Sequence, residues 1–325
     1  MRAVVVNQFG DPAMLVVQEV PTPEPGPGEV VVKVEAAGVN PVDTYIRSGR
    51  YAMLPTLPYI PGSDGAGTIS AVGSGVTTWK QGDRVFFHGT ALGRPAGAYA
   101  EYALCAAEHV FRLPANTGFA EGAALGIPYA TAHLALFHRA AARPGEIVLV
   151  HGASGGVGIA ALQLARWKDL KVIGTAGSPE GLDLVKANGA HFAVSHREAL
   201  YYDQIKAAAS NGRGPDVILE MLANVNLDHD LDMLAPRGRI VVIGSRGRVE
   251  IDPRKTMRGN GAILGLSMWN ATMDDLAPVY AELVQGLEQG VLVPVIRQEW
   301  SFDEAPRAHD EVMNQGAYGK IVLRP

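Results

Sequence analysis

A glycine-rich turn between an apolar run and a helix-like segment is the feature that most constrains this chain. Residues 147–150 read Ile-Val-Leu-Val, and glycines follow at positions 152, 155, 156 and 158. Residues 159–167 then continue with a helical pattern. In such a strand–turn–helix unit, glycines let backbone N–H groups approach a pyrophosphate at the positive end of the helix. The order predicts a dinucleotide-binding unit, although the G-x-x-G-G-x-G spacing departs from the usual G-x-G-x-x-G.

More units of the same kind follow along the chain. Six apolar runs of strand length alternate with helical patterns, at residues 147–150, 171–175, 192–195, 217–220, 240–243 and 263–266. This alternation is typical of a doubly wound parallel sheet. Residues 1–122 are instead β-rich, and the tail from 291 again reads as strands and turns. We therefore predict an α/β protein with one β-rich domain (1–122 and 291–325) and one Rossmann domain (123–290).

Composition excludes several classes of protein. The formal net charge is −5 without a long basic run, which argues against a dedicated nucleic-acid surface. The longest uncharged stretch, 122–138, is too short and polar to span a bilayer, and the N-terminus reads as a strand rather than a signal peptide. Cys105 is the single cysteine, so neither an intrachain disulfide nor a zinc site of several cysteines is possible. We expect a cytoplasmic protein.

The residues after the second strand of the Rossmann domain favour NADPH over NADH. An NAD site commonly places Asp or Glu there for the ribose 2′-OH, but residues 174–177 read Gly-Thr-Ala-Gly. Glu180 follows slightly later and weakens the argument. His196, Arg197 and Arg246 are cations that can reach a 2′-phosphate, unless they are ordinary surface groups.

The sequence predicts no catalytic metal. Segments 37–43 and 61–64, where a zinc-dependent alcohol dehydrogenase needs Cys or His ligands, offer Asn40, Asp43, Ser63 and Asp64 instead. None of the nine histidines lies at a metal-like spacing. Without a Lewis acid, we expect acceptors that take hydride without strong carbonyl polarisation: quinones, enones or enals.

Segments across nearly the whole chain, in order, carry a family resemblance. They are residues 38–49 (Gly-Val-Asn-Pro-Val-Asp-Thr-Tyr-Ile-Arg-Ser-Gly), 61–64, 82–85, 149–158, 220–227 and 242–247. In these segments the chain resembles the zeta-crystallin branch of the medium-chain quinone oxidoreductases. The resemblance implies a GroES-like catalytic domain, NADPH as cofactor, no zinc and one-electron-type reduction of ortho-quinones. It also implies a homo-oligomer, a dimer or more commonly a tetramer.

Matching motifs also imply the site residues. The NADPH contacts would be Tyr45, Ser154, Gly155, Gly156, Val157, Gly177, His196, Asn226, Ile243, Gly244, Ser245, Arg246, Leu266, Ser267 and Met268. Asn40, with Asp43, would orient Tyr45 or the cofactor ribose, although Asn and Asp beside a proline also simply make turns. Tyr45 and Tyr51 would position the nicotinamide or the acceptor, unless Tyr45 is a core residue and Tyr51 a surface aromatic. The acceptor loops would be 51–59 and 89–97, from which no substrate can be read.

These observations predict a zinc-independent NADPH:quinone oxidoreductase that binds ortho-quinone-type acceptors in a cleft between its domains. An NADPH-dependent enoyl or alkenal (enone) reductase on the same fold is the first alternative; it would need a group that protonates carbon. A non-catalytic RNA-binding or crystallin-like structural protein is the second. The acidic net charge disfavours RNA as the main ligand.

Overall fold

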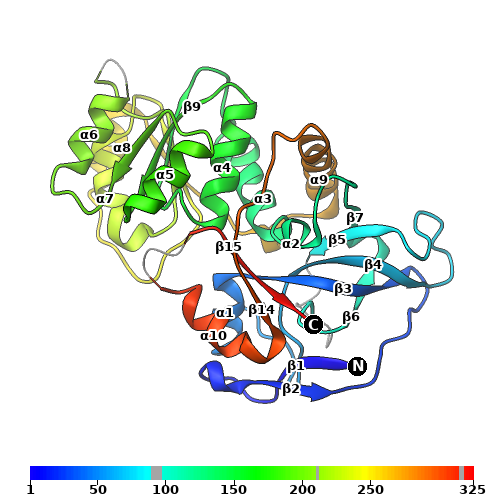
Figure 1. The fold of residues 1–325 in the computed structure, drawn as a ribbon. Helices are drawn as coiled ribbons and strands as arrows, with labels where there is room; N and C mark the ends of the chain where they lie inside the picture. Colours follow the sequence, from blue (N-terminus) through cyan, green and yellow to red (C-terminus); the bar gives the residue numbers. More distant parts are fainter. Residues whose placement is uncertain (89–96, 210–211, 315–317) are drawn as a thin grey trace. The chain divides into compact units, whose positions relative to one another are not determined.

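The computed structural model describes residues 1–88, 97–209, 212–314 and 318–325. The chain divides into two compact units (Figure 1). Unit 1 comprises Met1–Ile127 and Met273–Pro325, and unit 2 comprises Pro128–Thr272. The predicted combination of a β-rich domain with a Rossmann parallel sheet is confirmed. Part of one predicted acceptor loop, residues 89–96, lies outside the described residues.

Unit 1 is built on a seven-stranded sheet in the order β14-β15-β3-β4-β5-β7, with β6 paired to β3, and on a separate antiparallel pair, β1-β2. Its strands are β1 (Arg2–Val6), β2 (Leu15–Glu19), β3 (Glu29–Val39), β4 (Asp64–Val72), β5 (Arg84–His88), β6 (Tyr102–Ala106), β7 (Val110–Arg112), β14 (Ile296–Ser301) and β15 (Lys320–Arg324). Its helices are η1 (Pro12–Met14), α1 (Pro41–Arg47), η2 (Ala107–His109), α2 (Phe119–Gly122), α9 (Met273–Glu288), η5 (Phe302–Glu304) and α10 (Ala305–Glu311). Strand β3 pairs with β4, β6 and β15, and its central position explains its nearly continuous apolar sequence.

Unit 2 is a six-stranded parallel sheet in the order β10-β9-β8-β11-β12-β13. Its strands are β8 (Ile147–Val150), β9 (Lys171–Ala176), β10 (Phe192–Ser195), β11 (Val217–Glu220), β12 (Arg239–Val242) and β13 (Ala262–Gly265). Helix α3 (Gly126–His133) runs into this unit; the further helices are η3 (Leu134–Arg139, a π-helical turn), α4 (Gly156–Trp167), α5 (Pro179–Ala187), α6 (Tyr201–Ala208), α7 (Ala223–Met233), α8 (Arg254–Gly259) and η4 (Met268–Asn270). The order reverses between β8 and β11, which makes this pair the topological switch point where such sheets bind ligands.

The units differ from the predicted domains at two places: unit 1 extends to Ile127 rather than 122, and it resumes at Met273 rather than 291 because it includes helix α9. The sequence prediction counted 273–290 with the Rossmann domain, since strand–helix alternation continues up to that point. In the structure, Tyr280 of α9 stacks on Phe111 with ring centroids 4.0 Å apart and on His88 at 4.9 Å. Its hydroxyl donates a hydrogen bond of 3.2 Å to the carbonyl of Gly126. These contacts pack α9 against strands of unit 1.

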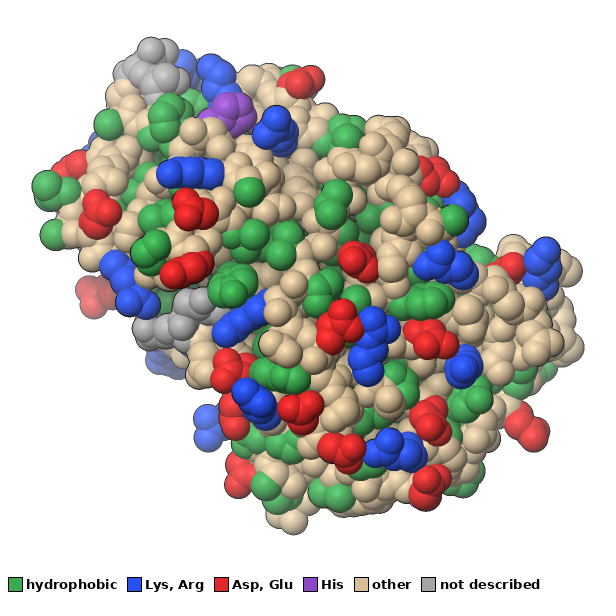
Figure 2. Space-filling model, in the orientation of Figure 1, with side chains coloured by type: hydrophobic (Ala, Val, Ile, Leu, Met, Phe, Trp, Pro, Cys, Tyr) green, Lys and Arg blue, Asp and Glu red, His purple; other side chains and the backbone are tan. Residues whose placement is uncertain are grey.

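Surface features of the described chain are ordinary for a globular protein. Lys and Arg side chains intermix with Asp and Glu on the face drawn in Figure 2. In the described part of the chain, no helix combines the length and the apolar character needed to cross a membrane.

Substitutions of Tyr280 test whether its ring holds α9 against the strands of unit 1. Replacing it with Ala removes a buried ring, which should lower the free energy of unfolding of unit 1 by about 3–5 kcal/mol. The control Tyr280→Phe keeps the stacking and loses one hydrogen bond, so it should cost only about 1 kcal/mol. Urea denaturation measures both, and equal costs would contradict the stacking argument.

Candidate functional site

The predicted cofactor residues of unit 2 share one edge of its sheet. Each of them follows the carboxyl end of a parallel strand: β8, β9, β10, β11, β12 or β13. They are Ser154, Gly155, Gly156, Val157, Gly177, His196, Asn226, Ile243, Gly244, Ser245, Arg246, Leu266, Ser267 and Met268. Parallel strands present all their carboxyl ends at the same edge, so the fold itself gathers these residues.

The glycines of the turn after β8 differ in whether and why the structure requires glycine at their positions. Gly152 has φ +58°, a conformation that favours glycine. A Cβ at Gly158 would lie 2.5 Å from both the Cα of Ala153 and the carbonyl oxygen of Gly152, so this glycine lets α4 approach the turn. Gly155, the N-cap of α4, has extended dihedrals (φ −78°, ψ 173°) that any residue adopts, and its Cβ would meet only the Gly152 oxygen, at 3.5 Å. Nothing in the described protein therefore requires glycine at 155.

A histidine and an arginine side chain lie at the end of β9. A Cβ at Gly177 would lie 2.7 Å from Nε2 of His196 and 3.2 Å from Nε of Arg197. Ser178 accepts a hydrogen bond from the N–H of Gly181 and caps α5, whose first turn carries Glu180. Burial, more than the neighbouring His151 and Arg197, lowers the pKa of His196. The third predicted cation, Arg246, follows β12, three strand positions or roughly 14 Å from β9.

The ends of β11 and β12 are joined by hydrogen bonds around Glu220. Its carboxylate accepts from the N–H of Leu222 and, at 3.2 Å, from the amide of Asn226. Its main-chain carbonyl accepts from the N–H groups of Ile243 (2.9 Å) and Gly244 (3.2 Å). After β13, Met268 is buried and its sulfur accepts from the hydroxyl of Thr131 at 3.7 Å.

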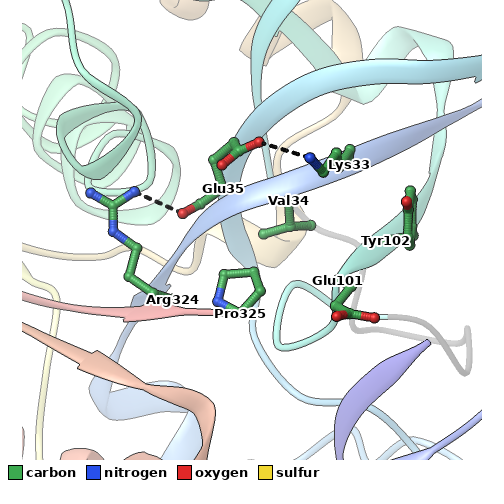
Figure 3. Close-up of a pocket in the computed structure, with 7 residues that line it drawn as sticks. All are labelled: Lys33, Val34, Glu35, Glu101, Tyr102, Arg324 and Pro325. Atoms are coloured by element: carbon green, nitrogen blue, oxygen red, sulfur yellow. Dashed lines mark hydrogen bonds and ion pairs between the residues drawn. The ribbon is translucent and has the colours of Figure 1, made fainter.

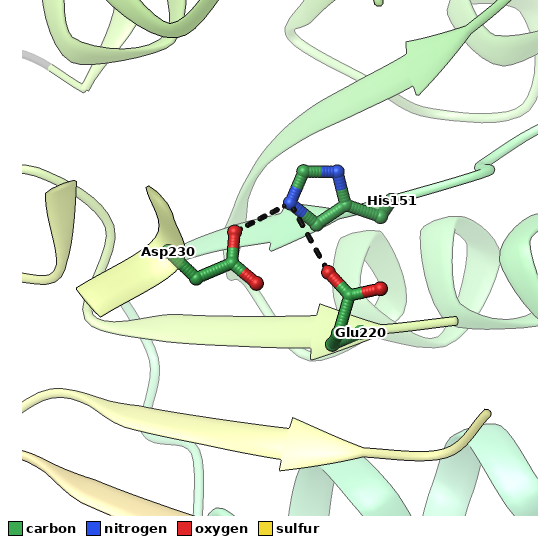
Figure 4. Close-up of side chains that lie close together, drawn as sticks. All are labelled: His151, Glu220 and Asp230. Carbon is green, nitrogen blue, oxygen red and sulfur yellow. Dashed lines mark hydrogen bonds and ion pairs between the residues drawn. The ribbon is translucent and has the colours of Figure 1, made fainter. Parts of the chain in front are cut away.

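A buried group formed by His151, Glu220 and Asp230 lies at the switch point (Figure 4). His151 follows β8, Glu220 ends β11 and Asp230 lies on α7. Nε2 of His151 is 2.8 Å from Oδ1 of Asp230 and 3.6 Å from Oε2 of Glu220. Burial lowers the pKa of His151, and it raises the pKa values of both carboxyl groups to about 7. Among the described residues, these three form the group whose side chains can together hold a metal ion.

The three remaining predicted site residues belong to unit 1. Asn40 is the N-cap of α1, and its side-chain amide donates 2.9 Å to Asp64 and accepts from the Lys320 ammonium. The Asn40 side chain thus serves the protein's own polar cluster. Tyr45 lies on α1 and is half-buried, while Tyr51 packs against the hydrophobic core of unit 1. Their roles toward cofactor or acceptor stay predictions.

Lys320 is the unexpected member of this polar cluster. Its Nζ is 3.4 Å from Oδ2 of Asp64, and both side chains are buried. Burial lowers the pKa of Lys320 and raises that of Asp64, against their mutual attraction. Burial also raises the pKa of the nearby Asp43 to about 7. The amino group of Lys320 therefore lies among the oxygens of the segments where a zinc-dependent alcohol dehydrogenase needs its zinc ligands.

A surface pocket of about 380 Å³ lies elsewhere in unit 1, and none of the predicted site residues lines it (Figure 3). Its walls include Lys33, Glu35, Glu101 and Arg324. The Arg324 guanidinium donates 2.8 Å to the Glu35 carbonyl, and Lys33 pairs with the Glu35 carboxylate at 3.6 Å. This charged, self-paired lining differs from the mostly apolar lining of typical ligand sites.

Sequence reasoning missed His151, Glu220, Asp230 and Lys320 as site residues. A signal existed for two of them: His151 directly follows a fully apolar strand, and Asp230 lies one helical turn from Leu227 on the buried face of α7. Lys320 gave no such signal, because a lysine near Arg324 reads as a surface charge until strand pairing buries it.

Two family models match the chain: "Alcohol dehydrogenase GroES-like domain" over residues 26–115 and "Zinc-binding dehydrogenase" over residues 156–285. A quinone oxidoreductase of Rattus norvegicus is 50% identical over 99% of this chain and 97% of its own length. Among solved structures, a quinone oxidoreductase of Escherichia coli complexed with NADPH is similar (TM-score 0.90, 30% identity, 100% of both chains). So is a protein described as an NAD-dependent alcohol dehydrogenase (TM-score 0.93, 30% identity, 100% of both chains).

The resemblance predicted from the motifs is therefore confirmed over almost the full length of the chain. Half-identity to a quinone oxidoreductase, both domain models and the shared fold agree. This chain belongs to the quinone oxidoreductase family of the medium-chain dehydrogenase/reductase superfamily.

Proposed function

We propose that this protein is an NADPH-dependent quinone oxidoreductase that works without zinc. The observation that carries the proposal is Gly155. Its backbone conformation and its protein neighbours both leave room for a side chain, so the missing Cβ leaves space for a ligand at the first turn of α4. Family membership supports the reaction, since the rat relative is a quinone oxidoreductase.

The turn suits a pyrophosphate for three physical reasons. The first N–H groups of a helix have no partner within it, and they point outward at the N-terminus of α4. The helix dipole adds partial positive charge there. A bare Gly155 then lets the phosphate oxygens reach these N–H groups. The residues present therefore fit a dinucleotide.

His196 and Arg197 support NADPH rather than NADH. The E. coli relative was solved with NADPH, whereas another similar structure is described as NAD-dependent, so the fold alone does not decide between them. The choice depends on what lies at the end of β9. Here two potential cations lie beside Gly177, and the described strand end has no carboxylate that would repel a 2′-phosphate. Arg246 follows β12, three strand positions from β9, which makes it the weaker candidate for this role.

Bound NADPH would supply the hydride, and the chain's own residues would bind and orient it. The α4 turn holds the pyrophosphate, and the loops after β11, β12 and β13 offer backbone groups along the same edge. Binding in one orientation lowers the barrier by converting an encounter into an intramolecular step. No residue is assigned to proton delivery, so we take the one proton that completes reduction of the acceptor, after hydride transfer, to come from water.

Lys320 supports the zinc-free reading. The segments 37–43 and 61–64 offer oxygen ligands, and the Lys320 ammonium already lies among them, bonded to Asn40 and 3.4 Å from Asp64. Two unit charges of like sign about 4 Å apart repel by roughly 4 kcal/mol at an effective dielectric constant of 20. A divalent cation in this cluster would meet about twice that repulsion. The family model named for zinc covers residues 156–285 and so none of these segments.

The ortho-quinone preference, the one-electron course and the homo-oligomer rest on the family resemblance. One structural feature suits an oligomer: β13 is an edge strand of the sheet, and its Ile263 is exposed. An exposed, apolar edge can pair with another chain. Intermixed surface charge offers no support for the RNA-binding alternative on the face seen in Figure 2.

Turnover measurements test the function directly. We expect rapid loss of nicotinamide absorbance with phenanthrenequinone and NADPH, slower loss with NADH, and little with a 2-alkenal. A chelator such as EDTA should leave the rate unchanged. Preferred reduction of the alkenal would favour the enone reductase instead, and loss of activity that zinc restores would refute the metal-free reading.

Variants of two neighbouring glycines should distinguish an effect on NADPH binding from an effect on folding. Gly155→Val should keep the melting temperature but raise the Kd for NADPH at least about tenfold, because its side chain would block the pyrophosphate. The matched control Gly158→Ala should lower the melting temperature, because its Cβ would lie 2.5 Å from backbone atoms. Calorimetry and fluorescence titration measure the two effects. Tight NADPH binding by Gly155→Val would exclude this cradle.

Arg197 and Arg246 form a second matched pair. Arg197→Ala should raise KM for NADPH by about tenfold and leave KM for NADH unchanged, because a charge-assisted bond to the 2′-phosphate contributes about 1.5–3 kcal/mol. Arg246→Ala should change the two KM values equally or not at all. Steady-state kinetics with both cofactors provides the comparison, and an equal effect of Arg197→Ala on both would remove it from the 2′-phosphate site.

A further inference from the structure

The buried group of His151, Glu220 and Asp230 occupies the only reversal of strand order in the six-stranded sheet of unit 2, as the described residues define it. His151 directly follows β8 and Glu220 ends β11, the two strands that flank the switch point, and Asp230 joins them from α7 (Figure 4). His151 directly precedes the glycine turn. The backbone N–H of His151 also donates to Leu219 at 3.1 Å, which fixes the start of the turn to β11.

Glu220 connects this group to two other predicted NADPH segments. One carboxylate oxygen, Oε1, accepts from the N–H of Leu222 and from the amide of Asn226. Its carbonyl accepts from Ile243 and Gly244, and the Gly244 carbonyl accepts from Ala223 at 2.9 Å. The other carboxylate oxygen, Oε2, has no hydrogen-bond partner among the described residues and faces His151. The side chain thus bridges the helix α7 start and the imidazole.

The distances fit shared protons better than a metal ion. Ligands about 2.0–2.2 Å from a tetrahedral zinc ion lie roughly 3.3 Å or more from one another. The 2.8 Å between Nε2 of His151 and Oδ1 of Asp230 is instead the length of a charge-assisted hydrogen bond. A proton shared between Nε2 of His151 and Oδ1 of Asp230 accounts for this distance, whichever of the two atoms carries it.

Complete burial makes this hydrogen-bonded group rigid. Glu220 and Asp230 are 0% exposed and His151 is 3% exposed, so water does not compete for their bonds. The titratable groups that interact with them are His196 after β10, which itself neighbours Arg197, and Tyr201 and Tyr202 on α6. In the described part of the chain, Glu220 and Asp230 pair with His151 and with no Lys or Arg.

We propose that His151, Glu220 and Asp230 are positioning residues for NADPH: they fix the glycine turn, the start of α7 with Asn226 and the segment 243–244 relative to one another. None of the three needs to touch the nucleotide. They act by holding Asn226 and the two backbone segments in one arrangement before the nucleotide arrives, so that binding does not have to order them. The inference rests on the proposed function, because it takes these segments as the NADPH site.

Glu220 and Asp230 variants test the proposal by direct NADPH titration and by steady-state kinetics. Glu220→Ala should raise Kd and KM for NADPH about tenfold or more with little change in kcat for the folded enzyme, because two bonds that orient the site are lost. Glu220→Gln should restore both to within about threefold, since its amide oxygen still accepts from Leu222 and Asn226. Asp230→Ala removes the partner of His151 but leaves the bonds of Glu220 to Leu222 and Asn226 in place, and it should raise Kd and KM as well.

Gln163→Ala is the matched structural control. Gln163 is a buried polar residue of unit 2 whose bonds to Tyr129 (2.7 Å) and Asn188 (2.8 Å) lie away from the predicted site. It should lower the melting temperature without changing KM for NADPH. If Glu220→Ala behaved like this control, with a lower melting temperature and an unchanged KM for NADPH, the positioning role would be refuted. An unchanged Kd for NADPH in Asp230→Ala would refute it as well.

Two further readouts separate this proposal from its rivals. Burial raises the pKa of Glu220 to about 7, so the folded protein loses stability relative to the unfolded chain as pH rises from about 4.5 to 7. Glu220→Gln lacks this ionisation. Its melting temperature minus that of the wild type should therefore increase between pH 5 and pH 8. Stoichiometric zinc in the wild type that His151→Ala loses would overturn the hydrogen-bonded arrangement. A wild type that binds no NADPH would instead refute the proposed function.

Discussion

The backbone contact at Gly158 is the constraint on which the candidate site depends. A Cβ at position 158 would lie 2.5 Å from backbone atoms of Ala153 and Gly152. Because glycine has no Cβ, the first turn of α4 can pack directly beside the end of β8. The helix N-terminus then lies at the carboxyl edge of the parallel sheet. Every other strand of unit 2 sends its following loop to the same edge. The close packing at Gly158 thus determines where the backbone N–H groups of the α4 N-terminus are available to a ligand.

The sequence predicted the sheet well because its signals are local. Buried parallel strands read as continuous apolar runs, and all six predicted strands of unit 2 lie within one residue of the observed ends. The prediction placed α9 in the Rossmann domain because strand–helix alternation does not say which surface a helix packs on. Tyr280 decided that through contacts with Phe111 and His88, which are distant in sequence.

The candidate site was predictable only where its chemistry lies in the main chain. Glycine spacing marks backbone approach, so the turn at 152–158 was visible from the sequence. Buried charges were not visible, because their partners come from separate segments: Asp64 meets Lys320, and His151 meets Asp230. The three cations proposed for the 2′-phosphate looked equivalent in sequence, and only the strand order separates His196 and Arg197 from Arg246.

The pairing of Lys320 with Asp64 has a consequence for the order of biosynthesis. Unit 1 is assembled from two segments, and all of unit 2 is translated between them. While the ribosome completes unit 2, Asp64 and Asn40 have no ammonium to bond, and β3 lacks its β15 neighbour. Burying Asp64 at that stage would leave a carboxylate uncompensated in an apolar interior. Unit 1 therefore completes its folding after unit 2, although its first residues leave the ribosome first.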